Sequence, residues 1–229
     1  MSEPLCFSQV ARKMHISDGL LPAPVVIGGY AITSLTTWYS LHQINRQSEP
    51  TQGIPKASLL TAAFFVASSI HIPFPPTSLH LILNGLLGVV LGYYAFPAIL
   101  IGLFFQAVML GHGGLSTLGL NAAIVGIPAL LIYHLFSWRS FIERYFNKRV
   151  TTGIFAFFAG ALGVALTVIL FFGLVVSTLG TGEHADSERV ATLGLVITHI
   201  PLMILEGIFT TFVVLFLQQA KPQLLEGNG

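Results

Sequence analysis

Residues 152–178 read TGIFAFFAGALGVALTVILFFGLVVST, an apolar stretch without a single charged side chain. A helix needs roughly 20 apolar residues to cross the hydrocarbon of a bilayer, because no water is present there to satisfy the backbone polar groups. This stretch is long enough to cross. It indicates a protein that is built from helices and embedded in a membrane.

The composition of the whole chain supports the same conclusion. Of its 229 residues, 54% are hydrophobic and 8% are charged, whereas about 25% are charged in a typical soluble domain. A net charge of +1 offers no basic field for nucleic acid, which excludes nucleic-acid binding. The single cysteine, Cys6, forms neither an internal disulfide nor a zinc or redox pair.

Apolar runs divided by glycine, proline and charge predict about seven transmembrane helices, at 20–42, 57–72, 79–96, 97–111, 121–137, 152–178 and 190–218. The third and fourth run short and are divided only by Phe96 and Pro97, so we expect a packed helical hairpin there. A count of six crossings stays open. The predicted fold class is all-α, a polytopic membrane helical bundle in one domain.

The basic residues predict how the bundle is oriented. They gather in the loops 43–56 and 138–150 and after the last apolar run: Arg46, Lys56, Arg139, Arg144, Lys148, Arg149 and Lys221. Positively charged loops stay in the cytoplasm. We therefore expect a multi-pass protein of the cell inner membrane, with its N-terminus outside, its C-terminus inside and residues 219–229 as a cytoplasmic tail.

One inner loop has a pattern of its own. Residues 138–149, WRSFIERYFNKR, alternate aromatic and basic side chains. This pattern is typical of a helix that lies on an anionic membrane surface, so membrane lipid is one expected partner. Docking against a partner subunit is the alternative interpretation.

Catalysis finds little support in the sequence. The motifs GxSxG and HExxH are absent, and the only acidic residue well inside an apolar run is Glu206. The phosphate-binding motif GxxxxGK[ST] is also absent, so the chain does not itself hydrolyse ATP. We expect a protein that is not an enzyme and that takes energy from an ion gradient or a partner.

Metal binding finds better support, in residues 12–22, RKMHISDGLLP. A chain that starts at Met14 offers its amine, the next amide nitrogen and the imidazole of His15, which suits Ni(II), Cu(II) or Co(II) better than Mg(II) or Ca(II). The amine must be free, so we expect residues 1–13 to be a start-site extension, disordered or absent. Removal of these residues, or a site with fewer backbone nitrogens, is the alternative. Residues 14–218 then form a single transmembrane metal-binding domain.

A further ligand is expected from the loop HIPFPPTSLH, residues 71–80, which offers His71 and His80. Its three prolines stiffen the chain and keep it extended.

The last apolar run carries two ionisable residues on one face. His199 and Glu206 are two helical turns apart, about 10 Å along the axis. Ionisable groups at membrane depth face the interior of a bundle. The two are interpreted as a structural polar face or, alternatively, as residues for gating or for coupling to a partner.

Four segments together resemble a known family: MHISDGLLP (14–22), TSLH (77–80), FFQAVMLGHGGLSTLGLNAAIVG (104–126) and HIPLMILEG (199–207). They are similar to the substrate-binding membrane subunit of cobalt and nickel energy-coupling-factor transporters, the CbiM/NikM family. The resemblance extends from residue 14 to about residue 218. It implies a seven-helix bundle whose N-terminal segment folds back into the outer mouth and supplies metal ligands.

Carried over by position, the resemblance implies that Met14, His15 and His80 bind the metal, whereas His71 matches no family ligand. It also implies a supporting loop around the site, formed by His112, Gly113 and Gly114 and flanked by Gln106 and Asn121. The paired glycines let irregular backbone pack closely, which is tolerated at membrane depth only inside protein or beside a cavity.

The function that the resemblance implies is capture of Co(II), or else Ni(II), at the outer face, with no permanently bound cofactor. Release into the cytoplasm would require a transmembrane coupling subunit, cytoplasmic ATPase subunits and often a small auxiliary membrane subunit. Cobalt would serve cobalamin biosynthesis. A nickel-specific subunit and a vitamin-binding subunit of a similar transporter are the alternatives. Because PFPPTSLH replaces the glycine-rich loop of the family, the choice of metal stays open.

Overall fold

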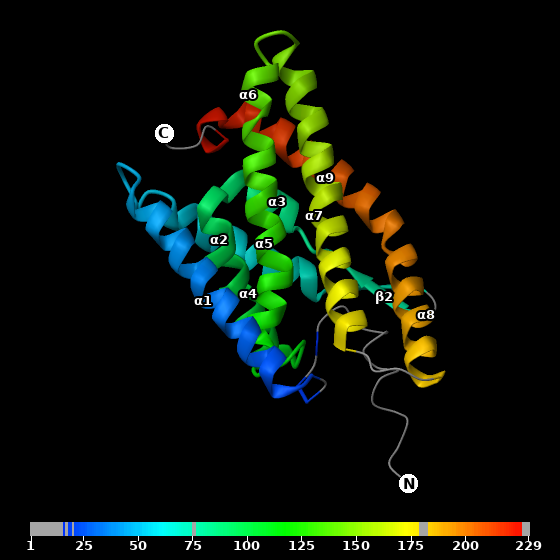
Figure 1. Ribbon diagram of the computed structural model, residues 1–229. Helices are drawn as coiled ribbons and strands as arrows, with labels where there is room; N and C mark the ends of the chain where they lie inside the picture. Colours follow the sequence, from blue (N-terminus) through cyan, green and yellow to red (C-terminus); the bar gives the residue numbers. More distant parts are fainter. Residues whose placement is uncertain (1–15, 17, 20, 75–76, 179–182, 226–229) are drawn as a thin grey trace.

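The computed structural model describes residues 16, 18–19, 21–74, 77–178 and 183–225 (Figure 1). The described helices are α1 (Ala23–Asn45), α2 (Ile54–Ser69), α3 (Asn84–Leu91), α4 (Ala95–Leu110), α5 (Leu118–Ser137), α6 (Arg139–Ile142), α7 (Lys148–Thr178), α8 (Glu183–Thr198) and α9 (Ile200–Ala220). Two short 3-10 turns, η2 (Gly92–Tyr94) and η3 (Pro222–Leu224), complete the helical part. The helical architecture agrees with the predicted class.

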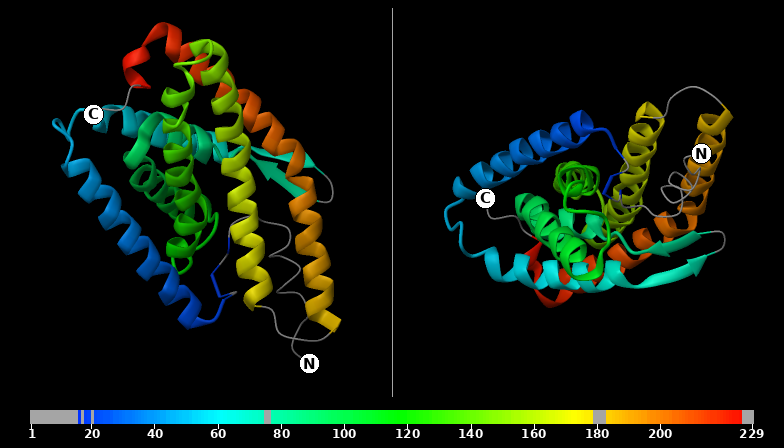
Figure 2. Two further views of the ribbon diagram at one scale, coloured as in Figure 1. Left: turned by 45° about the horizontal axis from the view of Figure 1, so that its top comes forward. Right: turned by 90° about the horizontal axis from the view of Figure 1, so that it is seen from below.

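One element departs from an all-helical fold. Strands β1 (His71–Phe74) and β2 (Thr77–His80) form an antiparallel hairpin in which His71 lies opposite His80. The sequence predicts an extended loop here, and proline does favour extended backbone in the residue before it. Two extended segments that are joined by a short connection can pair, which the local sequence does not reveal. Figure 2 shows the hairpin passing beside α9.

Four helical segments among the described residues are long and apolar enough to cross a membrane: Asn84–Leu110, Leu118–Ile142, Lys148–Thr178 and Thr192–Ala220. Helix α2 is apolar but shorter. These segments fit the prediction of a membrane protein. The count of seven crossings and the sides on which the two termini lie stay predictions.

The division between the third and fourth predicted helices lies earlier than expected. The helix breaks at Gly92, with φ of 59° and ψ of −125°, a conformation that glycine adopts without steric cost. Pro97, the expected breaker, lies in the first turn of α4, where its missing N–H removes no helical hydrogen bond. The prediction of a break at Phe96 and Pro97 is therefore wrong in position.

Small residues bring the central helices together. A Cβ atom on Gly85 of α3 would lie 2.2 Å from the carbonyl oxygen of Ala159 in α7, and one on Gly160 would lie 2.4 Å from that of Glu206 in α9. Helix backbones that touch in this way are typical of packing inside membranes. Figures 1 and 2 show α7 and α9 side by side along their lengths.

The connections at the two ends of the bundle differ in charge. The α1–α2 connection, α6 and η3 lie toward one end, which we call the basic end, and the first turns of α8 lie toward the other (Figure 1). The basic end carries the loops in which the sequence places most of the Lys and Arg residues.

Candidate functional site

The described chain begins at a residue that is tied to α5. The Ile16 N–H donates to Asn121 Oδ1 at 3.0 Å, and Asn121 Nδ2 donates to the Ile16 carbonyl oxygen at 3.0 Å. The hydroxyl of Thr117 donates to the same carbonyl at 2.6 Å. Ile16 is 1% exposed and packs against apolar side chains of α5, α7 and α8. The residue that directly follows His15 is thus fixed against the first turn of α5.

The loop between α4 and α5 holds the same segment from a second side. Asp18 Oδ1 accepts hydrogen bonds from the backbone N–H of Ser116, at 2.9 Å, and from its hydroxyl. A Cβ atom on Gly114 would lie 1.9 Å from Asp18 Oδ1, so a larger residue there would displace the Asp18 carboxylate from Ser116. Gly113 has a φ of 77°, in the region that favours glycine. These glycines therefore serve close packing of the loop on the N-terminal segment.

His112 lies at the start of that loop and is partly exposed. Its backbone N–H donates to the Gln106 carbonyl at 3.2 Å, which ends α4.

The chain that follows His80 is tied to α9. Glu206 is fully buried, and its carboxylate accepts hydrogen bonds from the N–H groups of Ile82 and Leu83, the second at 2.9 Å. Leu83 has a φ of 50°, the one non-glycine residue with positive φ in the described chain. That conformation costs about 1–2 kcal/mol. Glu206 therefore holds the unfavourable backbone of Leu83 in place, three residues after His80. His80 itself is 8% exposed.

The next residue connects this segment to α5 as well. The Asn84 amide is buried and donates to the carbonyl oxygens of Val125 and Gly163, each at 3.1 Å, and to the Thr167 hydroxyl at 2.8 Å. Val125 follows Asn121 by four residues, one helical turn or about 6 Å along the axis. The segments next to His15 and His80 therefore contact α5 at positions one turn apart.

A third buried amide fixes the start of the hairpin. Gln106 of α4 is 1% exposed, and its Nε2 donates to the hydroxyl of Ser68 in the last turn of α2, shortly before β1. Asn121 and Glu206 thus hold the chain beside His15 and His80, and Gln106 holds the end of α2, from which the hairpin leads to His80. Polar side chains inside a bundle usually pair in this way, although the amide oxygens of Gln106 and Asn84 accept no hydrogen bond from the described residues.

His199 and Glu206 have separate hydrogen-bond partners. Nδ1 of His199, which is 2% exposed, donates to the Leu195 carbonyl at 2.7 Å, while Glu206 binds the backbone after β2. His199 lies where α8 ends and α9 begins, two residues before Pro201. Within the described chain no hydrogen bond joins the two side chains.

Two of the three predicted ligands, Met14 and His15, lie outside the described residues, as does the extension 1–13. Among the described residues no group of three or more His, Cys, Asp or Glu side chains could hold a metal ion. The ligand set thus stays a prediction, whereas the residues that anchor its neighbours are visible. Sequence reasoning missed Asp18, Thr117 and Asn84. Asn84 could have been found as a lone amide within an apolar run.

Comparison with known proteins shows the family to which the chain is related. The family model CbiM, described as "Cobalt uptake substrate-specific transmembrane region", matches residues 15–224. The cobalt transport protein CbiM of Clostridium tetani is 30% identical over 223 residues, which cover 94% of this chain and 89% of that protein. The fused nickel transport protein NikMN of Rhodobacter capsulatus is 31% identical over 93% of this chain, which spans 64% of that protein.

The fold has a counterpart among solved structures. The crystal structure of a truncated transition metal transporter superposes with a TM-score of 0.70 at 23% identity, covering 90% of this chain and 98% of the other. At this identity the likeness supports the fold.

Proposed function

The chain belongs to CbiM, the family of cobalt uptake substrate-specific transmembrane regions, and on this premise we propose how it works. It is a membrane component of metal uptake and not an enzyme. In the proposal it is the substrate-binding subunit of an energy-coupling-factor importer. It captures Co(II) at the outer mouth and delivers it inward with a separate coupling subunit and ATPases, for cobalamin biosynthesis. Nickel uptake for nickel enzymes is the alternative, favoured by the name of the Rhodobacter relative.

One observation carries the proposal: two segments that are distant in the sequence contact α5 one helical turn apart. Asn121 binds Ile16, and one turn further along the helix the Val125 carbonyl accepts from Asn84. These two contacts support a shared site for His15 and His80. His15 directly precedes the anchored Ile16, and His80 lies four residues before the anchored Asn84. Imidazole and amine nitrogens are the donors that Co(II) and Ni(II) favour.

The anchors also explain how such a site would achieve affinity. A metal site gains when the groups around its ligands fix their position before the ion arrives, and loss of such support costs about 10–100-fold in affinity. Here the supporting groups are buried hydrogen bonds that bridge residues far apart in the sequence. The metal is the transported substrate, so these bonds hold the segments ready while the ion comes and goes.

The direct test has a binding arm and a transport arm. Elemental analysis of the purified full chain, combined with sequencing of its N-terminus, identifies the bound ion and tells whether Met14 carries a free amine. Uptake of labelled cobalt is then measured in cells with this chain alone, with the coupling and ATPase subunits added, and with the ATPases inactivated. Uptake is expected only in the complete, active system. Uptake that survives ATPase inactivation would refute energy coupling by ATP.

The same material separates the alternatives. Equilibrium competition between Co(II) and Ni(II) on the purified protein decides between the two metals. For a vitamin-binding subunit, His15→Ala would leave vitamin uptake intact. In the proposed metal site the same substitution abolishes metal retention.

Asn121→Ala is expected to lower metal affinity by roughly tenfold, because it removes both amide contacts that fix Ile16 beside His15. The matched control is Thr117→Val, which removes one hydrogen bond to the same carbonyl and keeps the shape of the side chain. Its effect is expected to be smaller. Calorimetric titration with cobalt measures both. An Asn121→Ala protein with unchanged affinity would show that this anchor does not serve the site.

Metal binding is expected to weaken steeply below about pH 6, because protons compete for the amine and for imidazoles, whose unperturbed pKa is about 6.5. Nitrogen donors bind metal only when deprotonated, so affinity is full on the alkaline side and is lost as the pH falls. Titrations at about pH 5 and about pH 8 measure the difference. Equal affinities at both values would count against nitrogen ligation.

A further inference from the structure

A cavity of about 410 Å³ opens at the basic end, remote in the fold from the α4–α5 loop that holds Ile16 and Asp18. Helices α2, α3, α5 and α6, the first residue of α7, turn η2 and residues Leu224 and Leu225 contribute to its wall. The charged side chains in the lining are Lys56, Arg139, Lys148 and Glu143. Three cations face one carboxylate, so the cavity has an excess of positive charge.

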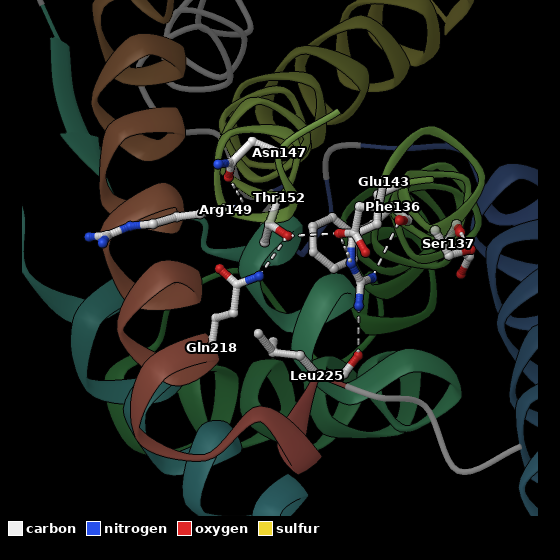
Figure 3. A network of polar contacts seen from close by, with 10 residues as sticks. Phe136, Ser137, Glu143, Asn147, Arg149, Thr152, Gln218 and Leu225 are labelled. Carbon is white, nitrogen blue, oxygen red and sulfur yellow. Dashed lines mark hydrogen bonds and ion pairs between the residues drawn. The ribbon is translucent and has the colours of Figure 1, made fainter. Parts of the chain in front are cut away.

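The one carboxylate in the lining is already engaged. Glu143 pairs with Arg139, with Nε and Oε1 3.5 Å apart, and accepts a hydrogen bond from the Thr152 hydroxyl at 2.8 Å (Figure 3). Gln218 Nε2 donates in turn to that hydroxyl at 3.0 Å. Arg139 also donates to the Leu225 carbonyl at 3.1 Å. Glu143 is therefore held at Arg139 and Thr152.

Lys56 forms no ion pair within the described part of the chain. Its Nζ donates to the carbonyl oxygen of Leu224 at 3.3 Å, and among the described residues no carboxylate lies within ion-pair distance of it. Partial burial lowers the pKa of the Lys56 ammonium, because desolvation disfavours its charged form. An anion in the cavity would supply the missing countercharge.

The surface next to the cavity is typical of a membrane interface. Four aromatic side chains of α6 and its flanks are strongly exposed: Trp138 at 69%, Phe141 at 64%, Tyr145 at 74% and Phe146 at 70%. Exposed aromatic rings concentrate at the level of lipid head groups. Basic pockets between transmembrane helices at this level bind anionic head groups.

We propose that this cavity binds the phosphate head group of an anionic phospholipid, with Lys56 and Lys148 contacting the phosphate oxygens. The Arg139–Glu143 pair forms the fixed wall beside them. A bound lipid joins the start of α2 to the start of α7, and thereby stabilises the basic end. The proposal goes beyond metal transport and does not depend on the identity of the ion.

The experiment uses the purified full chain, freed of lipid in detergent and titrated with phosphatidylglycerol, phosphatidylcholine or inorganic phosphate. Native mass spectrometry counts retained lipid, and thermal unfolding reports stabilisation. We expect preferential retention of phosphatidylglycerol and a higher unfolding midpoint with it. The double variant Lys56→Gln, Lys148→Gln is expected to lose about 30-fold in retention. The double variant Lys56→Arg, Lys148→Arg keeps both positive charges, so it is expected to retain phosphatidylglycerol.

The control is Arg144→Gln, which removes a basic residue of the same loop that does not line the cavity. It is expected to retain phosphatidylglycerol normally. Equal retention of both lipids would overturn the proposal, and so would an equal loss in Arg144→Gln, which would indicate diffuse surface attraction. A full thermal shift with inorganic phosphate alone would also overturn it, because the site would then take a free anion and not a lipid.

Discussion

His80→Ala is expected to reduce cobalt or nickel retained by the purified protein to background, a loss of affinity of at least 100-fold. Removal of groups that merely support a ligand already costs about 10–100-fold, and removal of the ligand itself costs more. His80 is the last residue of β2, and the backbone that follows it is held by Glu206 through the N–H of Leu83. No other described histidine lies so close in the chain to Ile82 and Leu83, the residues that Glu206 anchors. Elemental analysis and cobalt titration measure the loss.

The hairpin provides a matched control for this substitution. His71 lies directly opposite His80 in the strand register, so His71→Ala removes the same side chain from the facing position. We expect it to keep most of the affinity. The opposite pattern, with metal lost in His71→Ala and kept in His80→Ala, would move the ligand to the first strand and refute the assignment. Thermal unfolding of both variants shows whether a loss reflects the site or the fold.

Glu206→Leu is expected to produce the second largest effect, although this residue is not a proposed ligand. The substitution leaves the N–H groups of Ile82 and Leu83 buried without their acceptor, at about 1–3 kcal/mol each. The left-handed backbone of Leu83 then loses its restraint. We expect a lower thermal midpoint together with a loss of about 100-fold in metal affinity.

Two further variants separate a positioning role of Glu206 from others. Gln218→Leu removes a polar contact near the opposite end of α9, so it should lower stability and leave metal affinity unchanged. Glu206→Gln keeps one acceptor oxygen and should give an intermediate loss of affinity. If Glu206→Gln binds metal normally but no longer supports uptake, a gating or coupling role replaces the positioning role. Normal binding and normal uptake in Glu206→Leu would refute both.

Part of the candidate site was accessible to sequence reasoning. Gln106 and Asn121 stand out as amides within apolar runs, and paired glycines such as Gly113 and Gly114 signal a close approach of backbones. The partners of these residues were not accessible. Asn121 binds a residue 105 positions away, and Glu206 binds one 124 positions away. No periodicity within a helix encodes a contact over such a separation.

The amino-acid sequence by itself determined that this protein lies in a membrane, that its architecture is helical and that its basic residues gather at one end. Those properties depend on hydrophobicity and charge, which act locally and can be summed along the chain. Only the tertiary structure decided that residues 71–80 pair as a hairpin and that the helix breaks at Gly92. It alone decided that Glu206 serves the backbone after His80 and not His199. These features arise because buried backbone polar groups need partners away from water, and the packed helices decide where those partners lie.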